Sequence, residues 1–535
     1  MSCRARAGSL LLGLLLFLGP VAVGAAGDAD VRARSLYELP SASHPAGQID
    51  ELVFGRLAQL GIEPAHVCSD AVFVRRVYLD AIGTLPSADE ARQFLQDRTP
   101  EKRRVLIDRL LERDEFADYW AMKWSDLLRI KAEFPVNLWP NAAQAYHRWV
   151  RTSIKENLPY DQFARTLLTS SGSNFRAPPV NFYRALQRKD PAGIAQAVAL
   201  TFMGARAEKW PADQLAGLAA FFSQVGYKST AEWKEEIVFF DPGKAPASAG
   251  NAKVKAVFPD GTAVELPPGR DPREIFADWL IDPNNPWFTR NIANRVWSWL
   301  LGRGIIHEPD DIRPDNPPAN PELLKFLEGE LIAAHYDLKH LFREILNSET
   351  YQLSCLPRTD RPEGAANFAS YPLRRLDAEV LIDALNEITG STENYTSTIP
   401  EPYTFMPVGQ RAVALPDGSI TNAFLEMFGR PPRDTGLEAE RANRSTAMQR
   451  LQLLNSSQIQ QKLAQGPKLQ ALIRTAGGPR EVIDALYLTI LSRLPTPEER
   501  QAIRAGMQSA NLGGRQAALD VAWALINSAE FLYRH

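Results

Sequence analysis

The sequence predicts a mainly α, multi-helical, two-lobed protein with a small β-hairpin insert between the lobes. From Ile49 onward, apolar residues recur with a helical period over most of the chain. One stretch alternates instead, "AKVKAVFPDGTAVELPPG" at 252–269, where apolar positions flank Asp260-Gly261. Because Asp-Gly between alternating segments favours a tight turn, we expect a β-hairpin there and no other strand region.

Helix starts are marked by capping residues. Ser87 with Glu90 three residues later predicts a capping box, and Thr496 with Glu499 predicts another. Thr99, followed by a proline and a glutamate, predicts an N-cap as well. These signals divide the periodic sequence into many helices.

Two of these helix starts belong to an internal repeat. The segment "VYLDAIGTLPSADEARQF" at 77–94 aligns with "LYLTILSRLPTPEERQAI" at 486–503. Further on, "LLERDEF" at 110–116 matches "LINSAEF" at 525–531, and "ILNSETY" at 345–351 resembles this second half alone. We interpret the repeat as a shared helix-turn-helix packing unit, in preference to a repeated ligand site.

The first residues have the layout of a secretory signal peptide. Two arginines precede an apolar run from Leu10 to Leu18 and a stretch of small residues, which predicts a signal peptide over 1–26 and export to the periplasm or beyond. Residues 27–47 are polar and proline-broken, so we expect a flexible leader. No later apolar run could span a membrane.

The charge balance argues against nucleic acid as a partner. The formal net charge is −3, and removal of the two signal arginines leaves about −5, which is nearly neutral for 535 residues. The 45% apolar content is enough to fill large cores.

Two cysteines remain after signal removal, Cys68 and Cys355. Export would permit a disulfide between them, but two unpaired thiols fit the sequence equally well. Either state is structural, because no Cys-x-x-Cys and no neighbouring histidine accompanies them.

Familiar catalytic and metal signatures are missing from the sequence. It contains no phosphate-binding glycine loop, no dinucleotide fingerprint, no His-Glu-x-x-His and no Gly-x-Ser-x-Gly. No two of the seven histidines have the i, i+4 spacing that aims both at one metal. We therefore expect no metal site and no cofactor.

The densest polar cluster lies in a proline-rich loop within 294–324. Its acids, packed this closely, could hold Ca²⁺ or act as an acid/base pair. Loop acids more often cap helices or pair with arginines, so the structural interpretation is favoured. The weak catalytic candidates are Glu308, Asp310 and Asp311. The weak binding candidates are Arg295, His307, Arg313 and Asn316.

Several long motifs occur in an order typical of one family. They include "FVRRVYLDAIGTLPSADEARQFL", "AMKWSDLLRIK", "DPREIFADWLIDPNNPWFTRNIANRVWSWLLGRG", "YDLKHLFREILNSETYQLS", "YPLRRLDAEVLIDAL" and "FGRPPR". The chain resembles the planctomycete cytochrome-associated domain of unknown function followed by the planctomycete secreted domain of unknown function. The resemblance runs from about Ile49 to the end of the sequence.

This resemblance implies a domain layout, but no catalytic residues, because the family has no established activity. We expect an N-terminal helical domain over 48–227, a linker with the hairpin over 228–268, a C-terminal helical domain over 269–475, and a terminal helical repeat over 476–535 that packs with it.

Two motifs expected from the resemblance are missing. Similar proteins have Cys-x-x-Cys-His between a Gly-x-Arg and a tryptophan, whereas here 204–206 run almost directly into 208–210. A second motif, Cys-x-Cys-Glu-Arg, falls on 437–441, where Glu440 and Arg441 remain but both cysteines are replaced. We hypothesise that the two motifs form one haem, metal or disulfide site that this chain has lost. Covalent haem is excluded, since Cys-x-x-Cys-His occurs nowhere.

Three functional hypotheses follow. The first is a non-catalytic scaffold or binding protein of the cell envelope, with a c-type cytochrome, another envelope protein or a polysaccharide as partner. It is favoured because the framework is retained without the cysteines, and 11 Trp, 14 Tyr and 24 Phe could supply an aromatic surface. The second is an envelope enzyme that acts on glycans through the loop carboxylates. The third, an electron-transfer accessory protein, has the least support.

Overall fold

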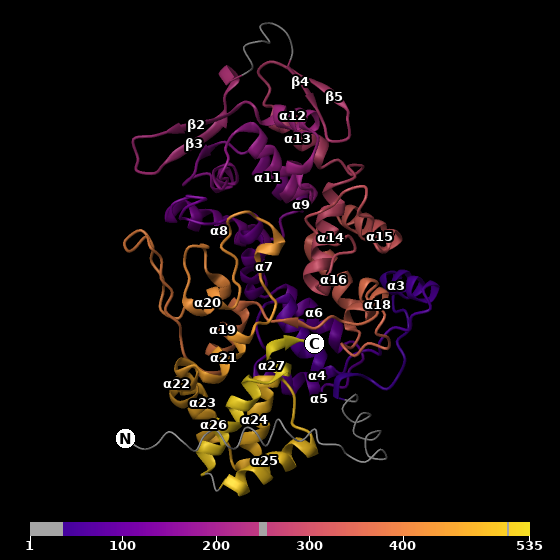
Figure 1. Cartoon of the computed structure of the whole chain (residues 1–535), viewed down its shortest axis with the longest axis vertical. Helices are drawn as coiled ribbons and strands as arrows, with labels where there is room; N and C mark the ends of the chain where they lie inside the picture. The colour runs from indigo at the N-terminus through magenta and orange to yellow at the C-terminus, as the bar shows by residue number, and fades with distance from the viewer. Residues whose placement is uncertain (1–35, 245–253, 511–512) are drawn as a thin grey trace.

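The computed structural model describes residues 36–244, 254–510 and 513–535, and the predicted signal peptide lies outside them. The mainly α class is confirmed, with helices throughout the chain (Figure 1). The longer helices up to the central strands are α3 (Gln48–Gln59), α4 (Asp70–Ala81), α5 (Ala88–Gln96), α6 (Lys102–Leu111), α7 (Asp114–Leu127), α8 (Pro140–Lys155), α9 (Tyr160–Thr169), α11 (Pro191–Met203) and α12 (Ala212–Ala219). Those that follow are α13 (Pro272–Leu280), α14 (Phe288–Leu301), α15 (Pro321–Ala333), α16 (Leu338–Asn347), α19 (Ala378–Thr389), α21 (Ala447–Asn455), α22 (Ser457–Gln465), α23 (Pro467–Thr475), α24 (Pro479–Leu491), α25 (Pro497–Ala510) and α26 (Gly514–Ile526).

The strands form small sheets. The predicted hairpin is present as β4 (Val254–Val257) paired with β5 (Ala263–Leu266). The expectation of a single strand region was wrong, because β2 (Val225–Ser229) and β3 (Glu236–Phe240) form a second hairpin that β1 (Gly172–Ser173) extends. Each of these strands is five residues or shorter, and their turn carries no Asn-Gly or Asp-Gly signal, so neither length nor turn chemistry distinguished them from the helical background. A third, short pair joins two segments far apart in the sequence, β6 (Arg374–Arg375) and β7 (Tyr533–Arg534).

One hydrophobic core runs through the described residues and crosses the predicted domain boundary. Helices from the first half pack on partners from the second: α3 on α15, α5 on α24, and α6 on α16. In Figure 1, α4, α5 and α6 accordingly lie among helices of the second half, while β2–β5 gather at one end of the elongated molecule and α21–α26 at the other.

Helix α4 is the point at which the repeated segments meet. Its Arg75 and Arg76 are both 1% exposed, and both donate to backbone carbonyls far away in the sequence. These acceptors lie in the second and third repeat fragments, two residues after the third, and at the last residue: Ile490 and Phe531 for Arg75, and Tyr351, Leu353 and His535 for Arg76, all at 2.7–2.9 Å. Two buried guanidinium groups thus supply donors that these carbonyls would otherwise lack.

The described part of the predicted flexible leader is attached to the helical body. Glu38 is 6% exposed, pairs with Arg358 at 2.7 Å and forms an isolated antiparallel bridge with Cys68. The Ser43 hydroxyl donates to the Ala65 carbonyl at 2.9 Å. The low apolar content of the leader gave no sign of this attachment, because hydrogen bonds and one ion pair hold the leader in place.

Two of the three predicted caps are confirmed. Ser87 with Glu90 forms the capping box of α5, and Thr496 with Glu499 exchanges the same pair of hydrogen bonds at α25. The Thr99 prediction was wrong, because its hydroxyl donates to Asp97 at 2.8 Å and α6 begins later, at Lys102. Glu101 stands at the N-cap position of α6 instead, and its side chain makes no capping hydrogen bond.

Within the described ranges, every helix is too short or too polar to cross a membrane.

Candidate functional site

The connection after α11 is short and closely packed. Gly204 ends the helix with φ +60, and Ala207–Lys209 form a single 3-10 turn, η2, before α12. A Cβ on Gly204 would lie 2.7 Å from the Asn291 side chain and 2.8 Å from the Pro309 carbonyl, so the glycine is required there. The segment to which the resemblance assigns Cys-x-x-Cys-His is thus replaced by a tight turn against the 304–320 loop.

That loop carries most of the candidates from the sequence, and Asp310 is the one at its centre. Asp310 is 1% exposed, and its Oδ1 accepts from Arg295 Nη2 at 2.7 Å. The Arg206 guanidinium, two residues beyond Gly204, donates to the Asp310 backbone carbonyl at 3.3 Å. The sequence singled out Asp310 and Arg295, and the structure brings them together as a buried ion pair.

The counterpart of Cys-x-Cys-Glu-Arg reaches the same aspartate from the other side. The Glu438 N–H donates to Asp310 Oδ2 at 2.6 Å, and the Glu438 carboxylate accepts from Trp299 Nε1 at 3.1 Å. Glu440 accepts the backbone N–H groups of Asp434 and Thr435, which fixes its own loop. The two segments to which the resemblance assigns cysteine motifs therefore meet at one residue, Asp310, the first at its backbone carbonyl and the second at its carboxylate.

The residues at this meeting point do not fit a haem or a metal ion. Both Asp310 oxygens are occupied by Arg295 and the Glu438 N–H, and the cysteine positions carry Leu437 and Ala439. In the described part of the chain, no group of three or more His, Cys, Asp or Glu side chains is arranged to hold a metal. Soft or borderline metals prefer thiolate and imidazole ligands, and the position supplies neither.

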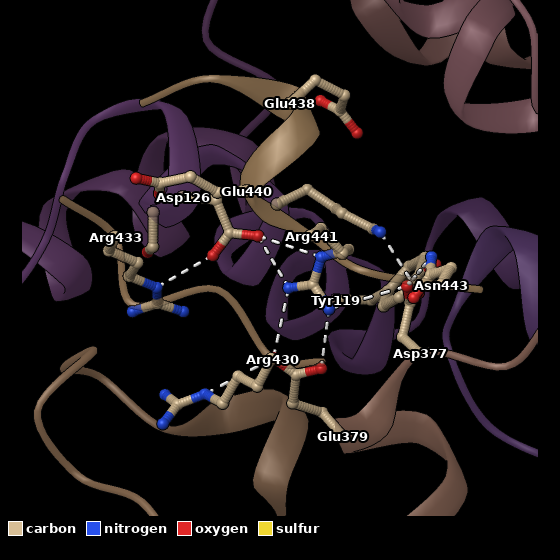
Figure 2. Close-up of polar contacts among 12 residues, drawn as sticks. Tyr119, Asp126, Asp377, Glu379, Arg430, Arg433, Glu438, Glu440, Arg441 and Asn443 are labelled. Atoms are coloured by element: carbon tan, nitrogen blue, oxygen red, sulfur yellow. Dashed lines mark hydrogen bonds and ion pairs between the residues drawn. The ribbon is translucent and has the colours of Figure 1, made fainter. Parts of the chain in front are cut away.

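Arg441, the last residue of the same motif, lies at the centre of a buried ionic cluster (Figure 2). Its guanidinium pairs with Asp126 at 2.6 Å, with Glu379 at 2.7 Å and with Asp377 at 3.6 Å. Further cations surround these acids: Lys123 and Arg534 lie against Asp377, Arg430 against Glu379, and Arg433 against Asp126. Acids and bases alternate, so few charges are left without a partner.

The electrostatics of this cluster keep its acids ionised. Burial by itself would raise the pKa of the Asp377 carboxyl, but Lys123, Arg534 and Arg441 outweigh burial and hold that pKa well below its ordinary value. Burial likewise opposes ionisation of Glu379, and Arg441 lowers its pKa. Neither acid is available as a proton donor near neutral pH, so the cluster serves to join α7, α19 and the 430–443 segment.

The other candidates lie in the same 304–320 loop and are exposed or only partly buried. Asp311 pairs with Arg313 at 3.2 Å, and Arg313 also reaches Asp315. The Glu308 carboxylate lies 3.6 Å from His307, and its side chain is 51% exposed. Asn316 donates to the His307 and Asp311 carbonyls, which closes the loop on itself. These acids therefore do not converge with Asp310 in a cleft.

Cys68 and Cys355 are both free thiols, so the structure does not contain the disulfide that the sequence allowed. Cys68 is buried and Cys355 is partly buried, and burial raises the pKa of the Cys355 thiol. Both lie beside the antiparallel bridge between Val67 and Leu353.

Sequence reasoning missed the buried ionic cluster. Lys123, Asp126 and Glu379 stand inside helices in which charged residues usually face water, so nothing local marked them as buried. The one usable signal was Arg441, which matches the arginine of the Cys-x-Cys-Glu-Arg motif that the resemblance assigns to 437–441.

Two domain descriptions match most of the chain. Residues 48–225 match PSCyt2, a protein of unknown function (DUF1549), and residues 272–507 match PSD1, a protein of unknown function (DUF1553). The chain belongs to the family that carries these two domains in tandem. They are the planctomycete cytochrome-associated and secreted domains of unknown function, so the predicted resemblance is confirmed. No curated protein and no solved structure matches the chain.

Proposed function

We propose that this tandem-domain protein is exported and acts in the cell envelope as a non-catalytic scaffold or binding protein, on a framework that has lost a cysteine-based haem or metal site. The observation that carries the proposal is the position of Asp310. It joins the shortened connection after α11 to the altered 437–441 segment, as expected if the missing motifs once shared one site.

The state of the acids supports binding over catalysis. A hydrolytic pair of carboxylates needs two acids facing one substrate bond, roughly 5–10 Å apart, one of them able to donate a proton. Here Asp310 is buried under Arg295 and Asp311 is held by Arg313, while Glu308 stands exposed beside His307.

The experiment that tests the proposal is capture of the tagged protein from its native envelope. The dithionite-reduced visible spectrum of the eluate is recorded, and the gel is stained for covalent haem. We expect a c-type cytochrome band in the eluate and no haem stain at the size of this chain. An unrelated tagged exported protein serves as the control. Haem stain on this chain would overturn the lost-site proposal, and capture of the chain without any partner would overturn the scaffold role.

A variant tests the status of the loop acids. Glu308→Gln combined with Asp311→Asn should leave folding intact and change the free energy of unfolding by no more than about 1 kcal/mol, because Glu308 is exposed and the partly buried Asp311 is paired with an arginine that is itself half exposed. Urea unfolding followed by circular dichroism measures this. Asp310→Asn is the matched substitution at a buried acid. It should lower the free energy of unfolding by about 3 kcal/mol because Arg295 loses its charged partner. A large loss in the double variant would instead make the surface loop a structural element.

A further inference from the structure

Three surface segments bring aromatic side chains together near the start of α8. Trp139 precedes this helix, Trp233 lies in the β2–β3 turn, and Tyr403 lies in the connection between α19 and the short helix α20 (Ala423–Met427). Figure 1 shows the β2–β3 hairpin and the orange connection before α20 on the same side of the molecule. The ring centroids of Trp139 and Trp233 are 6.5 Å apart at 85°, and those of Trp139 and Tyr403 are 5.3 Å apart at 61°.

These rings are open to solvent. Trp233 is 68% exposed and Tyr403 is 45% exposed, and Trp139 is half-buried beneath them. Single exposed apolar residues are common on protein surfaces, but two exposed aromatic rings that both contact a third are not what solubility favours. The same segments also expose Phe134 and Phe405. We call Trp139, Trp233 and Tyr403 the aromatic platform.

A lysine ammonium accompanies the platform. Lys234 Nζ lies 5.1 Å from the Trp139 ring centroid and 5.3 Å from the Trp233 ring centroid, within cation–π range of both. Among the described residues, no carboxylate lies within 4 Å of this ammonium. The acids and cations nearby in the sequence have partners of their own: Glu232 with Arg176, and Lys131 with Asp434. The platform therefore offers a cation that still lacks an anion.

Backbone contacts hold the platform in place before any ligand arrives. Trp139 has φ +74, an uncommon conformation for a bulky residue, and its N–H donates to the Ala132 carbonyl at 3.1 Å. Glu133 accepts from Ser397 and from the Thr398 N–H, which ties the segment before α8 to the one that bears Tyr403. Such pre-organisation lowers the entropic cost of binding.

The hairpin is held in the same way. Lys234 also has positive φ, +63, and its carbonyl accepts from the fully buried Asn174 side chain at 3.2 Å. Asn174 Oδ1 accepts the Glu236 N–H at 2.9 Å. The position of the ammonium over the two indoles is thus set by the hairpin backbone as well as by the side chain.

The size and chemistry of the platform select its ligand. Aromatic side chains bury roughly 150–250 Å² each when fully covered, so three partly exposed rings offer on the order of 300 Å². A stable protein interface needs about 800 Å² per partner, which is well above this area. Sugar rings have apolar C–H faces that stack on indoles and hydroxyl edges that stay in water, and a short run of them fits the area. A cationic ligand is disfavoured because Lys234 already occupies the cation position.

We propose that the aromatic platform and Lys234 bind an acidic polysaccharide, with the pyranose rings stacked on Trp233, Trp139 and Tyr403 and a carboxylate or sulfate group paired with Lys234. This inference deepens the proposed function and rests on its binding role. It does not depend on the lost cysteine site, which lies elsewhere in the fold.

Affinity electrophoresis of the purified protein tests the inference. The gels contain polygalacturonate, dextran sulfate or neutral dextran. We expect retardation by at least one of the two charged polymers and little by dextran. Which charged polymer retards the protein tells whether the anion is a carboxylate or a sulfate. Equal retardation by dextran would overturn the assignment of Lys234 as the anion partner.

Variants separate a built site from general charge attraction. Trp233→Ala should weaken binding about tenfold without lowering the melting temperature, because the side chain is exposed. Lys234→Gln should weaken it several-fold. The matched control is Lys228→Gln, which removes an exposed lysine from strand β2 of the same hairpin and should leave affinity unchanged.

Two results would overturn the proposal. The first is no retardation by either charged polymer, and the second is equal losses for Lys228→Gln and Lys234→Gln. The cytochrome capture experiment does not depend on these gels, so failure of the platform leaves the scaffold proposal to be judged on its own.

Discussion

The two copies of the repeated unit build the same side-chain cluster from different sequence positions. In the first copy, Arg113 pairs with Glu90 at 2.9 Å and Glu115 at 2.6 Å, and its guanidinium lies over the Tyr78 ring. This arginine stands at the start of α7. Arg113 thus pairs with one acid from α5 and one from α7, and the cluster joins these two helices of the unit.

In the second copy, Arg493 takes the same role with Glu499 at 2.7 Å and Glu530 at 2.5 Å, over the Tyr487 ring. It comes from the turn after α24, at a position that aligns with Thr84 of the first copy. The tyrosine and the two acids correspond in sequence, whereas the arginine does not. The geometry of the acids thus determines where a guanidinium is needed, and more than one backbone position can supply it.

The copies also differ in what surrounds them. The first copy buries three charged residues, Arg75, Arg76 and Asp80, at positions where the second has Asp484, Ala485 and Thr489. Ten of the twelve residues of α4 are buried, against six of the thirteen residues of α24, which lies toward the lower end of the molecule in Figure 1. The same unit therefore carries extra buried charges only where neighbouring segments have carbonyls and hydroxyls that need partners.

The turn between the helices shows the same effect. Gly83 and Ser492 occupy aligned positions, and both have φ +60. A Cβ on Gly83 would lie 2.4 Å from the Tyr119 ring, so the first copy requires glycine, while the second tolerates serine. Because the first copy is packed more tightly at this turn, only glycine fits at the position where the second copy has serine.

The largest expected effect comes from breaking the central copy at its contact with the other fragments. Arg76→Met should cost about 3–5 kcal/mol of unfolding free energy, because it leaves three buried carbonyls without a donor. Urea unfolding measures the loss. Arg104→Met, which removes an exposed arginine, should change stability by less than about 0.5 kcal/mol. Similar losses for both variants would show that α4 does not connect the fragments.

The next effect compares the two arginines directly. Arg493→Met should cost about 2–3 kcal/mol, since its side chain is 5% exposed and two carboxylates lose their partner. Arg113→Met should cost about 1 kcal/mol, since its side chain is 28% exposed and water can replace it. The melting temperatures of the two variants show which substitution destabilises the protein more. The reverse order would mean that position in the fold matters more than burial.

Acid stability provides a smaller contrast. Burial opposes ionisation of Glu499, but Arg493 holds the pKa of its carboxyl below the ordinary value. A lowered folded-state pKa contributes stability above the unfolded value of about 4.5, and this stability is lost as the pH falls through the folded value. Glu499→Gln should therefore reduce stability at pH 7 and show a shallower loss below pH about 4.5 than the parent. Parallel melting curves against pH would contradict this.

The smallest effect is a rescue. Adding Thr84→Arg to Arg113→Ser moves the arginine of the first copy to the position used by the second. We expect the free energy of unfolding to rise by about 0.5–1 kcal/mol relative to Arg113→Ser alone, because the two acids remain in place to pair with the new arginine. The same substitution in the parent is the control and should not stabilise it. No recovery would show that the two clusters are not interchangeable.

Local sequence patterns were enough to predict the helical class, the hairpin at Asp260-Gly261 and two capping boxes, because each of these depends on residues close together in the chain. They also singled out Asp310 and Arg295, since loop acids near arginines are visible as a local pattern. The folded chain was needed to show that Asp310 joins the connection after α11 to the 437–441 segment, and that Arg441 lies among Asp126, Asp377 and Glu379. It was also needed to show that Trp233 and Tyr403 both contact Trp139 near the surface. These contacts join residues tens to hundreds of positions apart, and burial and pairing at such separations depend on how helices pack, which no local pattern records.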